Sequence, residues 1–318
     1  MVRYVLRRVG MQFAVLIAST IIIFILLHLA PGNPATLLNG GHPPSPATIK
    51  YFNQLYGFNR PLPIQYLIWL HHVLEGNLGV SIATRTSVSS VIIPRIGLTL
   101  FLTVYAVAIM VIVGVPLGIV SAVFRSGPTD FFASMLSLTL TAIPTYVTGV
   151  VLAVVFGVIL NWFPALGGGD TGSFFTRLDH LTLPAIALGL SSMALASRIT
   201  RSAVIGELER PHVIGARARG FSEPRVVGKH AVRGAMVPVV TIVGAQVGYL
   251  LGGAVVIEYA FGLNGLGTLL VSSVEGKDYA VVQAIALFIT AEFLIISLVV
   301  DLLYGLIDPR VRLVGRTA

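Results

Sequence analysis

Cysteine is absent from the 318-residue chain, and charged residues make up only 11% of it. Without a thiol, the chain has no disulfide, no thiolate metal site and no cysteine nucleophile. A soluble domain usually carries about 25% charged residues, so most of this chain is not built to face water. The sequence also lacks the Gly-x4-Gly-Lys-Ser/Thr phosphate loop and the His-Glu-x-x-His zinc motif. We therefore expect neither a phosphate-loop nucleotide site nor a zinc site of this type within the chain.

Hydrophobic residues are abundant where charged residues are few. They make up 55% of the chain, and the mean hydropathy is +0.90. A transmembrane helix needs about 20 mostly apolar residues. We therefore predict an all-α polytopic membrane protein with about six transmembrane helices. The six apolar runs are Val9–Ala30, Gly97–Phe124, Phe131–Leu160, Leu181–Ile205, Met236–Ile257 and Ala280–Ile307.

The domain organisation follows from these runs. The first run is longer than the roughly 7–15 apolar residues of a signal-peptide core, so we expect residues 1–30 to hold a tail and a retained first transmembrane helix. Residues 31–95 are polar and rich in proline, and we expect an extracytoplasmic segment with short helices. Residues 96–307 then form a core of five transmembrane helices, with a cytoplasmic loop at about 206–233. Residues 308–318 form a cytoplasmic tail.

The net charge of +8 is unevenly distributed along the chain. If the N-terminus is cytoplasmic, about 15 of the 21 Lys and Arg residues fall on the cytoplasmic side of the six runs. Basic residues accumulate on that side of membrane proteins. We therefore predict a multi-pass protein of the cell (inner or plasma) membrane with both termini in the cytoplasm, and we assign the positive charge to topology rather than to nucleic-acid binding.

The basic loop between the fourth and fifth runs is the most informative segment. Pro211 suits the first position of a helix, and Gly220 suits the residue just beyond its end. Arg217 and Arg219 stand near the C-terminal end, where cations interact favourably with the helix dipole. The pattern predicts a short helix. On these residues alone, an ordinary basic cytoplasmic loop is equally compatible with the sequence.

Several stretches of the chain resemble the permease subunits of ABC importers. The loop resembles their "EAA" loop, and the chain as a whole resembles the B-type permease of the dipeptide/oligopeptide/nickel importer family. The matching stretches are Ala216–Ser222, Lys229–Arg233, Val237–Val240, Tyr56–Leu62, Gly76–Gly79, Phe261–Gly267, Val300–Tyr304 and Asp308–Arg310. The resemblance covers nearly the whole chain and implies a type I ABC importer permease fold.

In that family the loop forms a coupling helix, which docks in a groove of a separate ATPase subunit. The resemblance therefore implies a coupling helix formed by Pro211, His212, Val213, Ile214, Gly215, Ala216, Arg217, Ala218, Arg219 and Gly220. Gly220 would end the helix, and Ala216 would allow close approach of the partner. The chain departs from the family pattern at Pro211–Ile214, where an acidic residue followed by Tyr-Val-Arg is usual.

The resemblance also implies the partners. They are a second homologous permease that makes a heterodimer, two ATPase subunits, an extracytoplasmic substrate-binding protein and the membrane lipid. The chain would need no cofactor and would not be an enzyme, because ATP and Mg are bound by the ATPase subunits. The cargo would be a di- or oligopeptide or a similar small solute.

Small and polar residues in the fifth run are candidates for the translocation path. Gly244, Gly248 and Gly252 are spaced four apart and form one face of a helix. Such a stripe allows close helix packing, and it is also compatible with a position along the path. Gln246 lies off the stripe, where it would either contact cargo or make a hydrogen bond to another helix.

Glu292 falls near the middle of the sixth run. A charge at mid-bilayer costs about 2.5–3.5 kcal/mol on insertion scales, so we expect this side chain to face the protein interior, a pore or a partner. It is either a structural anchor or a pathway residue. An alternative function follows from it, a secondary transporter with Glu292 as its proton or ion site. A membrane enzyme or scaffold is a further alternative, although the sequence shows no cluster of catalytic groups.

Overall fold

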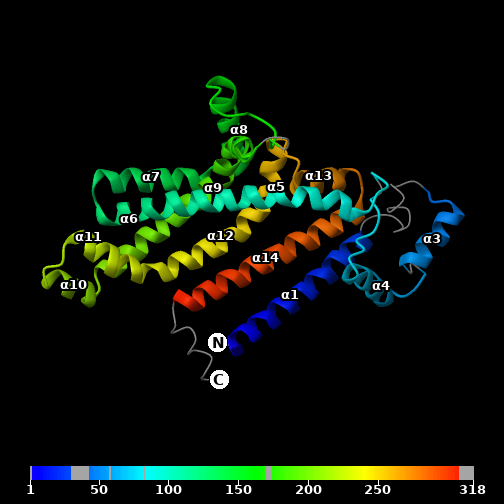
Figure 1. The fold of residues 1–318 in the computed structure, drawn as a ribbon, viewed down its shortest axis with the longest axis horizontal. Coiled ribbons are helices and arrows are strands. Elements are labelled where there is room, and N and C mark those ends of the chain that lie inside the picture. The colour runs from blue at the N-terminus through cyan, green and yellow to red at the C-terminus, as the bar shows by residue number, and fades with distance from the viewer. Residues whose placement is uncertain (1, 30–42, 57–58, 82, 170–172, 308–318) are drawn as a thin grey trace. The chain divides into compact units, whose positions relative to one another are not determined.

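The computed structural model of the chain describes residues 2–29, 43–56, 59–81, 83–169 and 173–307 (Figure 1). Within them every regular element is helical, apart from an isolated bridge between Val80 and Ser87. The predicted all-α class is confirmed. The expected tail at 308–318 lies outside the described residues.

Long helices account for most of the chain. Five of the described helices are long and apolar enough to cross a membrane, and there are six if a bent pair is counted as one span. In chain order the elements are α1 (Val2–Leu29), α3 (Pro46–Tyr56), α4 (Leu62–Leu74), α5 (Val88–Ile109), the π-helix η1 (Met110–Gly114), α6 (Val115–Val123), α7 (Pro128–Ala142), α8 (Thr145–Leu152), η2 (Ala153–Ile159), α9 (Phe174–Leu208), α10 (Pro211–Ala218), α11 (Glu223–Arg225), η3 (Val226–Ala231), α12 (Val232–Ala260), α13 (Leu266–Glu275) and α14 (Tyr279–Ile307).

The third predicted span is not one continuous helix. α7 ends at Ala142, and α8 leaves it at an angle of 105° (Figure 1). Pro144 stands at the break, and Ile143 before it is extended. Proline has no N–H to donate and disfavours the helical conformation in the residue before it. The predicted third run, Phe131–Leu160, is therefore divided at Pro144 into two helices.

The chain divides into two compact units, which are described separately. The first is built mainly from Leu100–Leu263. Its central element is α9, about 52 Å long at 1.5 Å per residue, which packs against α6, α7, α8 and α12. A Cβ atom on Gly118 would collide with the backbone carbonyl oxygen of Ser197 and stand 3.1 Å from the backbone nitrogen of Arg201. α6 therefore lies backbone to backbone against α9, which small residues permit.

The second unit consists of Arg7–Thr99 and Asn264–Leu294. Val88, Ile92, Leu266, Val281 and Ile285 are fully buried together in its core.

Two short helices, α3 and α4, occur within residues 31–95 of this unit. α4 is fixed to α1 by a hydrogen bond of 2.9 Å between the hydroxyl groups of Tyr66 and Thr20. The extracytoplasmic placement of this segment remains a prediction.

Candidate functional site

A helical hairpin follows the end of α9. α10 begins with Pro211 in its first turn, after Arg210 in extended conformation, and it ends at Ala218. Gly220 has a φ of +78°, the left-handed conformation that glycine adopts at helix ends without steric cost. The structure thus has a short helix at the position expected for the coupling helix. Figure 1 shows α10 and α11 at the shared end of α9 and α12.

One face of α10 is packed inside the hairpin. Val213 and Ala216 are fully buried and contact Val226 of η3, with Leu208 and Phe221 around them. The small side chain of Ala216 therefore serves packing within this chain. It is not exposed in this arrangement, contrary to the close approach of a partner that we expected of Ala216.

The opposite face of α10 is open to solvent. Pro211, Ile214 and Ala218 are exposed, Ile214 to 53%, and a Cβ atom added to Gly215 would meet nothing within 4 Å. These four residues have the spacing of a single helix face. We call them the outer face of α10. It carries no charge. Its side chains are one exposed isoleucine, one proline, one alanine and one glycine.

Charged groups surround this outer face. Arg217 donates to both carboxylate oxygens of Glu223 at 2.8 and 3.1 Å, which holds α10 to α11. These bonds raise the pKa of the Arg217 guanidinium above its ordinary value. Arg219 and Arg225 lie over the ring of Phe221, at 5.5 and 5.0 Å from its centroid. The hairpin is thus tied together by its charged groups as well as by its apolar core.

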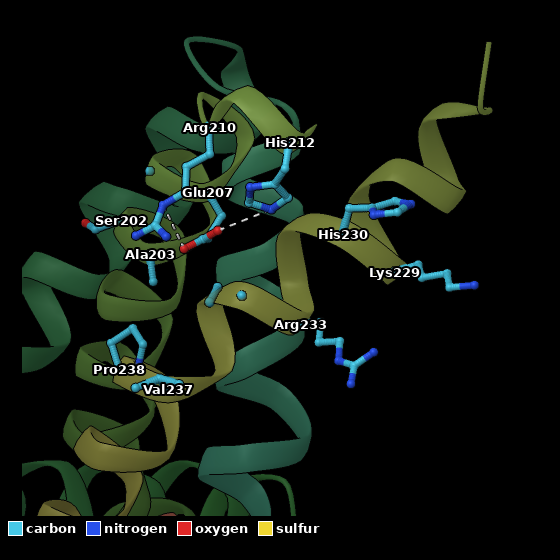
Figure 2. A pocket seen from close by; sticks show the side chains of 13 residues that line it. Ser202, Ala203, Glu207, Arg210, His212, Lys229, His230, Arg233, Val237 and Pro238 are labelled. Atoms are coloured by element: carbon cyan, nitrogen blue, oxygen red, sulfur yellow. Dashed lines mark ion pairs between the residues drawn. The ribbon is translucent and has the colours of Figure 1, made fainter. Parts of the chain in front are cut away.

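A cavity of about 760 Å³ opens between the end of α9 and the start of α12 (Figure 2). In it the carboxylate of Glu207 faces Arg210 at 3.2 Å and His212 at 3.9 Å. Lys229 and Arg233 line the same cavity but point away from Glu207. Glu207 was not predicted as a site residue, although an acidic residue at the end of an apolar run next to a basic loop was a usable signal.

Gly234 allows α12 to begin beside Glu207. A Cβ atom at this position would collide with the Glu207 carboxylate group. Any larger residue must therefore displace either the carboxylate or the helix.

The candidate path residues fall in different environments. Gln246 donates a hydrogen bond of 2.9 Å to the hydroxyl of Ser192 and so joins α12 to α9, which is one of the two roles considered for it. Gly244 and Gly248 are half-buried. Gly252 is exposed, and a Cβ atom there would meet nothing within 4 Å. At Gly252 the stripe is therefore not used for packing against any of the described residues.

Glu292 lies in α14, in the second unit, and is 8% exposed. The burial agrees with the expectation that this charge avoids lipid. Its role as anchor or pathway residue remains a prediction. Four other acidic side chains of the described residues, none of them predicted as site residues from the sequence, are at least as deeply buried: Asp130, Glu207, Glu258 and Asp278.

Comparison with known proteins decides the family. Residues 114–313 match the family described as "Binding-protein-dependent transport system inner membrane component", and residues 1–103 match its N-terminal domain. The chain belongs to this family. It is 39% identical to the "Putative peptide permease protein" of Brucella ovis and 38% identical to the "Glutathione transport system permease protein GsiC" of Salmonella typhimurium. Each match covers 98% of this chain and 99% of the relative.

A solved structure supports the same fold. The methionine ABC transporter MetNI, in an inward-facing conformation, superposes with a TM-score of 0.57 at 18% identity, over 69% of this chain and 96% of that one. The predicted ABC importer permease fold is confirmed. The protein is the permease subunit of an ABC importer, a multi-pass component of the inner membrane. Membership of the family implies that it works with a binding protein and an ATPase and has no catalytic activity of its own.

Proposed function

We propose that this permease translocates short peptides or similar small solutes such as glutathione, and that the outer face of α10 docks on an ATPase subunit. The cargo is suggested by the names of the relatives in Brucella and Salmonella. The secondary-transporter alternative has no comparable support. Pro211, Ile214, Gly215 and Ala218 carry the docking proposal, because they leave an uncharged helix face without a covering element in the described chain.

The proposed topology places both termini and the hairpin in the cytoplasm, as the distribution of the 21 basic residues favours. Residues 31–95 then lie outside and contact the binding protein that delivers the cargo. Two ATPase subunits bind ATP and Mg and hydrolyse the nucleotide. A second, homologous permease completes the path. The open position at Gly252 fits this arrangement, since it leaves room for a neighbouring helix.

The hairpin is suited to transmit motion. α9 leads directly into it and α12 leads directly out of it. Its buried core of Val213, Ala216 and Val226 resists deformation, because close-packed interiors are poorly compressible. A displacement of α10 by closing ATPase subunits would therefore move the ends of α9 and α12. Such an event shifts a two-state bundle between its inward- and outward-facing forms.

The docking proposal can be tested by adding bulk to the outer face. Gly215→Leu introduces a large side chain where the chain itself offers open space, so the permease should fold and insert normally. Gly228→Leu is the matched control, because a Cβ atom at Gly228 of η3 also meets nothing within 4 Å. Each variant is assembled with its partners in vesicles, and ATP-driven uptake is measured together with co-purification of the ATPase.

We expect Gly215→Leu to lose ATPase co-purification and uptake, and Gly228→Leu to retain both. Normal uptake by Gly215→Leu would refute docking at the outer face. The cargo is tested separately with the intact importer, by competition of uptake with dipeptides, glutathione and free amino acids. A failure of peptides and glutathione to compete would refute the proposed cargo and leave the docking proposal intact.

A further inference from the structure

The cavity beside the hairpin has two chemically different ends. Its ionisable lining comes from the hairpin and the helix ends next to it: Glu207, Arg210, His212, Lys229, His230 and Arg233. Its apolar lining comes from Ala203, Val237 and Pro238, which lie within the apolar runs of the fourth and fifth spans. The cavity therefore extends from the hairpin to the ends of the fourth and fifth apolar runs.

The charges in this cavity do not cancel. Glu207 is engaged by Arg210 and His212. Among the described residues, neither Lys229 nor Arg233 has a carboxylate within ion-pair distance. Their side chains extend to the same side, away from Glu207 (Figure 2). Two full positive charges thus remain without an acidic partner on one wall of a cavity of about 760 Å³.

An anionic phospholipid matches both ends of this cavity. Its phosphate oxygens accept charge-assisted hydrogen bonds from Lys and Arg, and its acyl chains can lie along the wall formed by Val237 and Pro238. Basic pockets between transmembrane helices are known to hold anionic lipid headgroups. We infer that this cavity binds one anionic phospholipid, with its phosphate held by Lys229 and Arg233.

The main competitor for these cations is an acidic surface on the ATPase subunit. Such a surface would pair with Lys229 and Arg233, but a purely acidic surface would leave the apolar wall at Val237 and Pro238 uncovered. The lipid occupies both ends and is therefore favoured by the lining. This inference goes beyond the proposed function, because it requires no partner subunit and can be tested on the chain alone.

The test uses the purified full-length chain in detergent. Phosphatidylglycerol or phosphatidylcholine is added, and bound lipid is measured by native mass spectrometry. Lys229→Gln/Arg233→Gln removes the two unpaired cations. Arg125→Gln/Arg225→Gln is the control: it changes the net charge equally, and neither residue lines the cavity. Lys229→Arg/Arg233→Lys keeps both charges and shows whether the site tolerates a change of side chain alone.

We expect the wild-type chain to prefer phosphatidylglycerol, and the Lys229→Gln/Arg233→Gln variant to lose affinity for it by a factor on the order of ten or more, since each basic residue near a lipid surface contributes appreciably to binding. The control and the charge-conserving variant should keep the preference. An unchanged preference in the Gln variant, or an equal loss in the control, would overturn the inference.

A second arm separates a lipid from a free anion, with inorganic phosphate as the probe. If phosphate binds the wild-type chain but phosphatidylglycerol has no advantage over phosphatidylcholine, the cavity is a free-anion site and the lipid inference is wrong. A third arm adds the ATPase subunit. If the Gln variant loses ATPase binding while its lipid preference is unchanged, the two cations belong to the ATPase interface and the inference is again wrong.

Discussion

Arg201 of α9 donates two hydrogen bonds to the carboxylate of Asp130 at the start of α7, through Nε at 2.5 Å and Nη2 at 2.7 Å. Ser121 of α6 donates to the same carboxylate at 2.6 Å. Asp130 is 6% exposed. Three helices of the first unit are thus joined at one buried carboxylate group, close to the end of α9 that enters the hairpin.

We predict that Asp130→Asn destabilises the protein. Removing one partner of a fully buried ion pair costs about 3–5 kcal/mol, and the partial exposure of Arg201 reduces our expectation to about 2 kcal/mol. Glu209→Gln is the control, because its pair with Arg125 is exposed and such pairs contribute under about 1 kcal/mol. Thermal unfolding in detergent compares them, and equal melting temperatures for the two variants would contradict the assignment.

We predict that the stability cost of replacing Gly220 depends on how readily the new residue adopts a positive φ, and not on the size of its side chain. The φ of +78° at Gly220 strains any residue with a Cβ atom, so Gly220→Ala is expected to cost about 1 kcal/mol. Gly220→Asn should cost less, because asparagine adopts this conformation more readily. Gly215→Ala is the control for stability, since Gly215 lies within α10 with open space around it. Equal stability of Gly220→Ala and Gly220→Asn would count against the strain argument.

Asp278 anchors a loop in the second unit. Its buried carboxylate accepts hydrogen bonds from Ser81 Oγ at 2.5 Å and from the backbone N–H of Ala83 at 3.2 Å. Asp278→Ala removes this acceptor and leaves the Ser81 hydroxyl and the Ala83 N–H without it, which costs about 1–3 kcal/mol. We therefore expect faster hydrogen exchange in the segment around Ala83. Glu275→Ala removes a nearby exposed carboxylate and should leave exchange unchanged. Equal exchange in both variants would show that the anchor is not needed.

Glu292→Gln separates an ATP-driven importer from a secondary transporter. For an importer with a buried structural carboxylate, uptake by the assembled complex should depend on ATP in both the wild-type protein and the variant. It should not respond to a proton gradient imposed without ATP. Gradient-driven uptake that disappears in Glu292→Gln would restore the secondary-transporter alternative.

The sequence predicted the long helices well because each one carries a long, mostly apolar run. The span over Leu181–Ile205 lies within α9, and the span over Met236–Ile257 lies within α12. Boundaries were less predictable. The second span begins at Val88, although the sequence predicted a start near Gly97. Its first turns bury Val88 and Ile92, but they also carry Ser and Arg residues, so they do not form a continuous apolar run.

The effect of each proline could not be predicted from the sequence. Pro144 breaks its helix while Pro184 lies inside α9, and only tertiary packing distinguishes the two. The buried face of α10 could not be predicted either. The helix has eight residues and only two of them, Val213 and Ala216, are buried, which is too few to give a clear hydrophobic period. The location of α10 came from Pro211 and Gly220, whose backbone preferences are local and therefore visible in the sequence.

The absence of cysteine makes one experiment especially direct, since a single introduced thiol is the only one in the chain. Ile214→Cys places it on the outer face of α10. Ile112→Cys is the control, because Ile112 is also exposed but lies within a span. Cross-linking is measured in the assembled importer. We predict a cross-link between Ile214→Cys and the ATPase subunit, and none from Ile112→Cys. An assembled importer without a cross-link at Ile214→Cys, or labelling of that thiol from outside intact cells, would contradict the coupling role of the hairpin.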